Sequence, residues 1–143
     1  MLNLPTYPNL VRQFFDNMSL GAFHMEATVM GKHIEISEQK LSSVLHIPKE
    51  GESYLVLKDK QKTLRIVLER SNVKGVIHVS ANQLALEMML LHNIISCIFL
   101  PWTGRLDWVS ERDLVFMRYL VEGEALNLPF IMLSHMREAA RMA

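Results

Sequence analysis

The stretch VSANQLALEMMLLHNIISCIF, residues 79–99, decides what kind of fold this chain adopts. Ser80 precedes a run long enough for one helix from Ala81 to about Phe99, and nearly every side chain in that run is apolar. Three polar residues fall in one narrow arc of the helical wheel: His92, Asn93 and Ser96. A helix that is hydrophobic almost all round belongs at the centre of a domain. We therefore predict a buried central helix at about residues 81–99.

Two more helices are predicted after this one. Pro101 ends the central helix, and a loop with two tryptophans follows. The second helix is predicted over residues 111–122 and stops at Gly123. The third begins after Asn127 and continues to the end of the chain. The C-terminal part of the chain is therefore expected to be helical.

The predicted helix starts share one pattern. A Ser or Asn side chain accepts hydrogen bonds from the free backbone amides of the first turn, and the apolar residue before it packs on the fourth residue of the helix. Four starts fit this pattern: Ser37, Ser80, Ser110 and Asn127. Each cap contributes about 0.5–2 kcal/mol to stability. These residues are therefore architectural, and neither Ser80 nor Ser110 is predicted to be a nucleophile.

The N-terminal half is predicted to combine a hairpin with short helices. Pro8 and apolar residues at helical spacing indicate a first helix. Residues 22–36 alternate between apolar and polar side chains, which is typical of a β-hairpin. Short helices follow over residues 37–45 and, with Asp59 as cap, over residues 60–70. The predicted fold class is α+β, mostly α.

Composition is typical of a folded protein that works inside a cell. The chain has 143 residues, half of them hydrophobic, and fifteen basic residues balance fifteen acidic ones. We expect one domain over residues 1–143, either a piece of a longer chain or a short reading frame, because the sequence ends within an apparent helix. The single cysteine, Cys97, allows no internal disulfide and suits a reducing compartment. No signal peptide or membrane span is indicated, so we expect a soluble, intracellular protein, cytoplasmic or nuclear and not secreted.

No pattern in the sequence indicates catalysis or metal binding. The six histidines are scattered, and none lies at a spacing typical of zinc ligands. The sequence holds no glycine-rich phosphate loop and no G-x-S-x-G elbow. Its acidic residues lie mostly at predicted caps or on helix faces near basic residues, as solvated surface charges do. We predict no catalytic residue, no metal, no cofactor and no small-molecule substrate, and an unrecognised enzyme is the least favoured alternative.

Several short segments occur along the chain in a characteristic order. In the first half they are LVRQFF at residues 10–15, VMGKHI at 29–34, and the helix at 37–45 followed by Ile47-Pro48. In the second half they are LHNII at 91–95, VSERDL at 109–114 and EGEALNLP at 122–129. Their order resembles the plant transposon protein domain, which occurs in plant retrotransposon reading frames and in host genes derived from them. The resemblance implies a helical, non-catalytic domain and carries over no catalytic residue.

Two surfaces are candidates for function. The loop before residue 111 carries Trp102, Arg105 and Trp108, residue types that commonly anchor protein interfaces, although at least one tryptophan is expected to fold back over the core. This favours a protein-interaction or assembly module, acting on itself or on another protein. The alternative is nucleic-acid binding through a basic face: Lys58, Lys60, Lys62, Arg65, Arg70 and Lys74. Zero net charge makes that alternative less favoured, because nucleic-acid-binding domains usually carry a basic excess.

Overall fold

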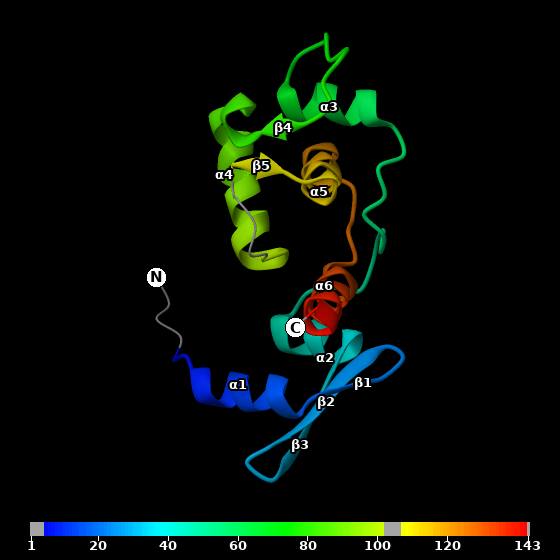
Figure 1. Cartoon of the computed structure of the whole chain (residues 1–143). Helices are drawn as coiled ribbons and strands as arrows, with labels where there is room; N and C mark the ends of the chain where they lie inside the picture. Colours follow the sequence, from blue (N-terminus) through cyan, green and yellow to red (C-terminus); the bar gives the residue numbers. More distant parts are fainter. Residues whose placement is uncertain (1–4, 102–106, 143) are drawn as a thin grey trace.

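The computed structural model describes residues 5–101 and 107–142, which form a mixed α+β fold dominated by helices (Figure 1). The predicted fold class is therefore confirmed. In chain order the elements are α1 (Pro8–Asn17), β1 (Ser19–Leu20), β2 (His24–Val29), β3 (Lys32–Ser37), α2 (Glu38–Leu45), α3 (Lys60–Leu68), β4 (Val79–Ser80), the 3-10 turn η1 (Ala81–Gln83), α4 (Leu86–Ile94), the π-helix η2 (Ile95–Phe99), β5 (Trp108–Val109), α5 (Glu111–Glu122) and α6 (Leu128–Met142).

The predicted hairpin is confirmed as β2 and β3, which pair antiparallel with His24 opposite Ser37. Met30 and Gly31 form the connection, and both have positive φ angles, 50° and 76°. A two-residue turn of this kind matches the twist of the strands that it joins. The short strand β1 pairs with the free edge of β2, an element that the sequence analysis did not predict. β2 is thus the central strand, and three of its side chains are buried: Met25, Ala27 and Val29.

The buried side chains form two hydrophobic cores. The smaller, N-terminal core joins Phe14 of α1 and the inward side of β2 to Leu133 of α6. The larger core is built from α3, α4, η2 and α5, and Ile131 of α6 belongs to it. Figure 1 shows α6 ending beside α2, with the elements of the larger core lying together on the other side of α6. Helix α6 therefore supplies neighbouring residues to both cores.

Helix α5 is the most deeply buried helix of the larger core. Its residues 113–117 are all buried, and Phe116 and Met117 have no exposed surface. Ser110 caps the helix as predicted: its Oγ accepts from the Asp113 amide at 3.1 Å, and its own amide donates to Asp113 Oδ2 at 3.4 Å. Gly123, in the left-handed region, ends the helix as expected.

The other predicted caps are confirmed, and Ser80 differs only in the length of the element that it begins. Ser37 Oγ accepts from the Lys40 amide at 3.2 Å, Asp59 Oδ1 from the Lys62 amide at 2.9 Å, and Asn127 Oδ1 from the Phe130 amide at 3.3 Å. Ser80 begins only the single turn η1, where its amide donates to Gln83 Oε1 at 3.0 Å. The start of the long predicted helix is therefore a separate short element.

The structure corrects the predicted central helix at residues 81–99 in two respects. Leu84 and Ala85 are extended and separate η1 from α4, whereas α4 continues directly into the π-helix η2. The second difference is burial: one face of α4 and η2 contacts the larger core, and the other face is exposed. A helical wheel alone did not predict which face points inward. The core accepts the polar side chain of His92 because Asp113 lies beside it. The central position belongs to α5 instead.

An extended connector, residues 46–59, links the two cores. Glu52 pairs with the segment before α6: its amide donates to the Ala125 carbonyl at 3.0 Å, and its carbonyl accepts from the Asn127 amide at 2.9 Å. Gly51 permits this approach, because a Cβ at that position would lie 2.3 Å from the Ala125 carbonyl group, and its φ is +103°. The Asn127 side chain completes the junction by donating to Glu38 Oε1 at 2.9 Å and to Ser53 Oγ at 3.2 Å.

Replacement of Asn127 by Ala should lower the free energy of unfolding by about 2–3 kcal/mol. The change removes a helix cap, worth about 0.5–2 kcal/mol, together with two partly buried hydrogen bonds of about 0.5–1.5 kcal/mol each. Urea denaturation followed by circular dichroism measures this loss. Asn127→Asp is the matched control: it keeps the capping oxygen but places a second carboxylate beside Glu38. A loss under 0.5 kcal/mol for Asn127→Ala would contradict the role assigned to this junction.

Candidate interaction surface

The outward face of helix α4 and the π-helix η2 is lined by large apolar side chains. Four large aliphatic side chains line the exposed face at four-residue spacing, Leu86 (70 % exposed), Leu90 (55 %), Ile94 (45 %) and Ile98 (61 %). We call these four residues the α4 ridge. The opposite face buries Met88 and Ile95 in the larger core, together with two polar residues, His92 and Ser96. Of the three residues in the polar arc predicted from the sequence, His92 and Ser96 are therefore buried, whereas Asn93 is exposed.

The buried polar side chains lie where α4 meets α5. His92 has no exposed surface, and its Nε2 lies 3.4 Å from Oδ2 of Asp113, which is 1 % exposed. The two are close enough to interact electrostatically, yet within the part of the chain that the structure describes neither ring nitrogen has an aligned hydrogen-bond partner. The hydroxyl of Ser96, one turn further on, is likewise buried without a partner among these residues. Their full burial keeps solutes away from these side chains.

The end of the ridge coincides with an irregular helix. In η2 the Leu100 amide donates to the Ile95 carbonyl at 2.8 Å, five residues back, so one extra residue is inserted in the turn. Such π-turns are rare, and they occur frequently at functional sites because they displace side chains from the regular helical positions. Here the wider turn lies where Ile95 and Ser96 point inward and Ile98 stays outside.

The predicted surface in the loop before α5 is described only in part. Trp102 and Arg105 lie outside the described residues. Trp108 belongs to β5, where it pairs with Ser80 of β4 and is 46 % exposed. Its ring meets the His78 ring edge-on, with the centroids 6.0 Å apart. Trp108 is therefore a half-exposed residue next to the strand that leads into η1 and α4.

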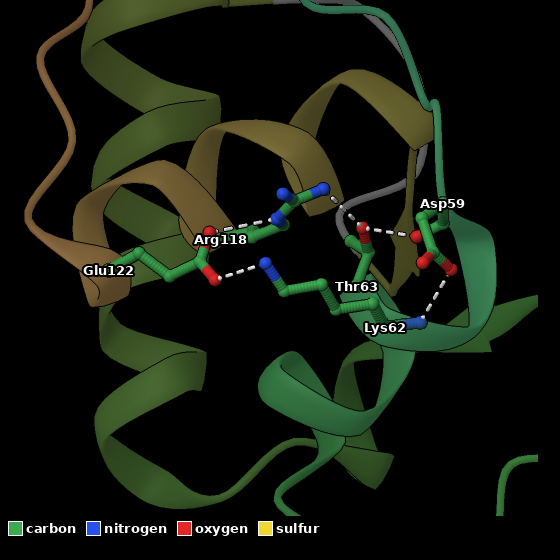
Figure 2. A network of polar contacts seen from close by, with 5 residues as sticks. All are labelled: Asp59, Lys62, Thr63, Arg118 and Glu122. Atoms are coloured by element: carbon green, nitrogen blue, oxygen red, sulfur yellow. Dashed lines mark hydrogen bonds and ion pairs between the residues drawn. The ribbon is translucent and has the colours of Figure 1, made fainter.

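The predicted basic face lies on and around α3, and one of its residues contributes to a structural ion-pair network. Figure 2 shows this network: Lys62 Nζ and Arg118 Nε each lie 2.9 Å from a carboxylate oxygen of Glu122, and Arg118 also reaches Thr63 Oγ1 at 3.4 Å. Thr63 Oγ1 in turn donates to the Asp59 carbonyl at 2.8 Å. Lys62 therefore helps to fasten α3 to α5. The hydrogen bonds from Lys62 and Arg118 hold the pKa of Glu122 below its ordinary value.

The remaining five basic residues are all exposed but are not equally free. Lys60 Nζ donates to the Ile77 carbonyl at 3.2 Å, and Arg65 donates to Gln61 at 3.3 Å. Three have no side-chain hydrogen bond or ion pair within residues 5–101 and 107–142: Lys58, Arg70 and Lys74. Some of the basic side chains on this face are therefore already engaged in contacts within the protein.

Two other polar groups lie on the surface. On the outer side of the hairpin, His24 Nε2 and His33 Nε2 approach the same Glu26 oxygen at 3.6 and 3.5 Å. Even so, no group of three potential ligands with the geometry to hold a metal ion occurs among the described residues. A cavity of about 270 Å³ beside α6 is crossed by the ion pair Arg112–Glu138 at 2.6 Å, which lowers the pKa of Glu138. That pairing neutralises the charges that line the cavity.

Comparison with known protein families, with curated proteins and with solved structures found no match to this chain. Over the described ranges, no helix has the length and apolar content needed to cross a bilayer.

Replacement of Ser96 by Ala should raise the free energy of unfolding by about 1 kcal/mol. A buried hydroxyl without a partner carries a desolvation penalty of about 1–3 kcal/mol, and alanine removes it while leaving only a small void. Ser43→Ala is the control, because Ser43 lies exposed in α2 and reports only the helix-propensity gain of at most about 0.5 kcal/mol. Urea denaturation of both variants measures the difference. A destabilised Ser96→Ala protein would show that the hydroxyl is satisfied.

Replacement of Glu122 by Gln should destabilise the protein at pH 7 and much less at pH 3. The folded pKa of Glu122 lies below its ordinary value of 4.5, so the unfolded chain binds more protons than the folded one as the pH falls through this range. The stabilisation by the charged carboxylate is therefore complete above about pH 5 and is lost as the pH falls through the folded pKa. Urea midpoints of the two proteins, measured from pH 7 to pH 3, test this convergence. A constant gap between the midpoints would contradict it.

Proposed function

We propose that this chain is a non-catalytic protein-interaction or assembly module and that the α4 ridge is its docking surface. The observation that supports this most directly is the set of large apolar side chains that α4 and η2 leave exposed, opposite a buried face that also holds Met88 and Ile95. The helix exposes four large aliphatic side chains while it buries His92 and Ser96. For an isolated monomer this orientation is unfavourable on both sides of the helix, since apolar surface stays in water and polar groups lose it. A partner that covers the ridge removes the first of these two costs.

The size of the expected gain supports docking through a few residues. Complete burial of a Leu or Ile side chain contributes about 1.5–3 kcal/mol, and the ridge residues are already partly covered by the protein. Four of them would together contribute several kcal/mol to binding. Interface energy is usually concentrated in such a small set of central side chains. Trp108 is half-exposed on β5, which pairs with the strand that precedes η1.

We also propose the evolutionary origin that the order of the sequence segments implies. A domain similar to the plant transposon protein domain would be an intracellular component derived from a retrotransposon reading frame, with no chemistry of its own. The segments that carry this resemblance include residues 91–95 and 109–114, which form the buried junction of α4 and α5.

Nucleic-acid binding through the basic face is the alternative. Lys58, Arg70 and Lys74 support it, because their charges are not engaged by other described residues. Against it, Lys62 is paired with Glu122, and the whole chain has no net charge to attract phosphates. The ridge is therefore the better-supported surface.

Photo-crosslinking from the ridge tests the proposal. Benzoylphenylalanine in place of Leu90 should capture a protein in cells that express the chain, whereas the same probe in place of Val44, an equally exposed apolar residue on α2, should not. The captured protein is then purified and its affinity measured. The variant Leu90→Glu/Ile94→Glu should weaken binding at least tenfold, and the matched control Val11→Glu/Val44→Glu should leave it unchanged.

The same preparations decide between the two functions. Fluorescence anisotropy with single- and double-stranded oligonucleotides should show no binding that weakens steeply with salt. The proposal is overturned if benzoylphenylalanine at position 90 captures no protein, while an oligonucleotide binds in a salt-dependent way and that binding is abolished in the variant Lys58→Ala/Arg70→Ala/Lys74→Ala. A captured second copy of the chain counts as a protein partner in this experiment.

A further inference from the structure

We infer that the occupant of the α4 ridge is a second copy of this chain, bound ridge to ridge with the two helices antiparallel. This inference depends on the proposed function, because it names the partner of the same surface. It is carried by the spacing of the ridge residues, by their charge surroundings and by the area that they expose. Each of these observations is a property of residues 86–98.

The spacing makes the ridge complementary to itself. Its residues lie at positions 86, 90, 94 and 98, so they are arranged symmetrically about position 92. When a second helix runs in the opposite direction about a twofold axis at that point, Leu86 of one copy meets Ile98 of the other, and Leu90 meets Ile94. All four side chains are then covered by the same four of the other copy, as a twofold interface requires. Asn93, exposed beside the ridge, lies close to the axis.

Charge decides between the antiparallel and parallel arrangements. Glu87 is the only Asp, Glu, Lys or Arg between residues 86 and 100, so the ridge offers no ionic feature for a charged partner to recognise. A parallel pair would place Glu87 beside the Glu87 of the other copy and would align the two helix dipoles in the same direction. An antiparallel pair separates these carboxylates by most of the ridge length and opposes the dipoles. The zero net charge of the chain adds no general repulsion between copies.

The exposed area sets the strength of the association. The ridge spans about 18 Å of helix, since each residue adds about 1.5 Å. Four aliphatic side chains that are about half exposed present a few hundred Å², the size of the largest functional patches on monomeric proteins. Two copies together would bury less than the roughly 1,200 Å² at which stable interfaces begin. The dimer is therefore weak and reversible, which suits a unit that assembles when several copies are held close together.

Sedimentation analysis of the purified chain tests the self-association. Over a range from about 10 µM to about 1 mM, which spans weak interfaces of this size, the average mass should rise toward that of a dimer. Leu90→Glu/Ile94→Glu should shift the dissociation constant at least tenfold upward, and Val11→Glu/Val44→Glu should leave it unchanged. Circular dichroism and urea midpoints establish that both variants fold. A chain that stays monomeric throughout, or a dimer insensitive to the ridge changes, overturns the inference.

Crosslinking between introduced cysteines tests the antiparallel geometry. In a Cys97→Ser background, Asn93→Cys should be linked to itself by a short bis-maleimide, because both copies place it near the axis. Leu86→Cys should not be linked to itself, but a mixture of Leu86→Cys and Ile98→Cys proteins should be linked to each other. Gln39→Cys, exposed on α2, is the control for random collision. Self-linking of Leu86→Cys that exceeds that of Asn93→Cys would overturn the antiparallel arrangement.

The two proposals fail in different ways. If the purified chain is monomeric but benzoylphenylalanine at position 90 captures another protein, the second copy is excluded and the interaction module stands. If the chain dimerises through a different surface and position 90 captures nothing, both proposals are overturned.

Discussion

The orientation of α4 depends on the packing of its buried face, with Met88, Ile95 and His92, against the larger core and Asp113. Asp113 is fixed in place because its backbone and side chain form the capping box with Ser110 at the start of α5. His92 lies 3.4 Å from it, with Met88 and Ile95 packed into the larger core along the same face of the helix. This packing turns the remaining faces of α4 outward. Rotation of the helix by half a turn would bury the ridge, but it would also leave Asp113 without its neighbour and expose Met88 and Ile95 to water.

The chain on either side of α4 holds the same orientation. Before the helix, β4 pairs with β5, and the Ala81 amide donates to the Asp107 carbonyl at 2.7 Å. After it, the π-turn of η2 delivers Leu100 to the larger core. These contacts are backbone hydrogen bonds and apolar packing, and they do not involve the outward-facing side chains of α4. The ridge residues can therefore be substituted without loss of these contacts.

Local signals in the sequence were sufficient to predict most elements but not how α4 packs. The caps at Ser37, Asp59, Ser110 and Asn127 depend on residues three positions away, and the hairpin depends on strict alternation, so both are legible in a single sequence. The packing of α4 could not be predicted in this way, because its buried face contacts Asp113, which lies 21 positions after His92. Strand β1 was missed because two residues are too few to show a period. The candidate interaction surface predicted from the sequence was the tryptophan loop, and the surface that we propose from the structure is the α4 ridge. The α4 ridge was hidden because apolar residues on a helix are ordinarily its buried side.

The polar groups inside the larger core and the apolar groups outside it are two consequences of one arrangement. Among the residues that the structure describes, the Ser96 hydroxyl has no hydrogen-bond partner and the His92 imidazole has no aligned one, and both lower the stability of the monomer. In a protein whose only requirement was to remain folded alone, apolar residues at these positions would be more stable. They resemble instead the polar residues that fix the register of helical assemblies, where a single buried polar group selects one orientation over alternatives that are more stable locally. In the interaction module that we propose, this buried seam selects the face of α4 that is offered to a partner.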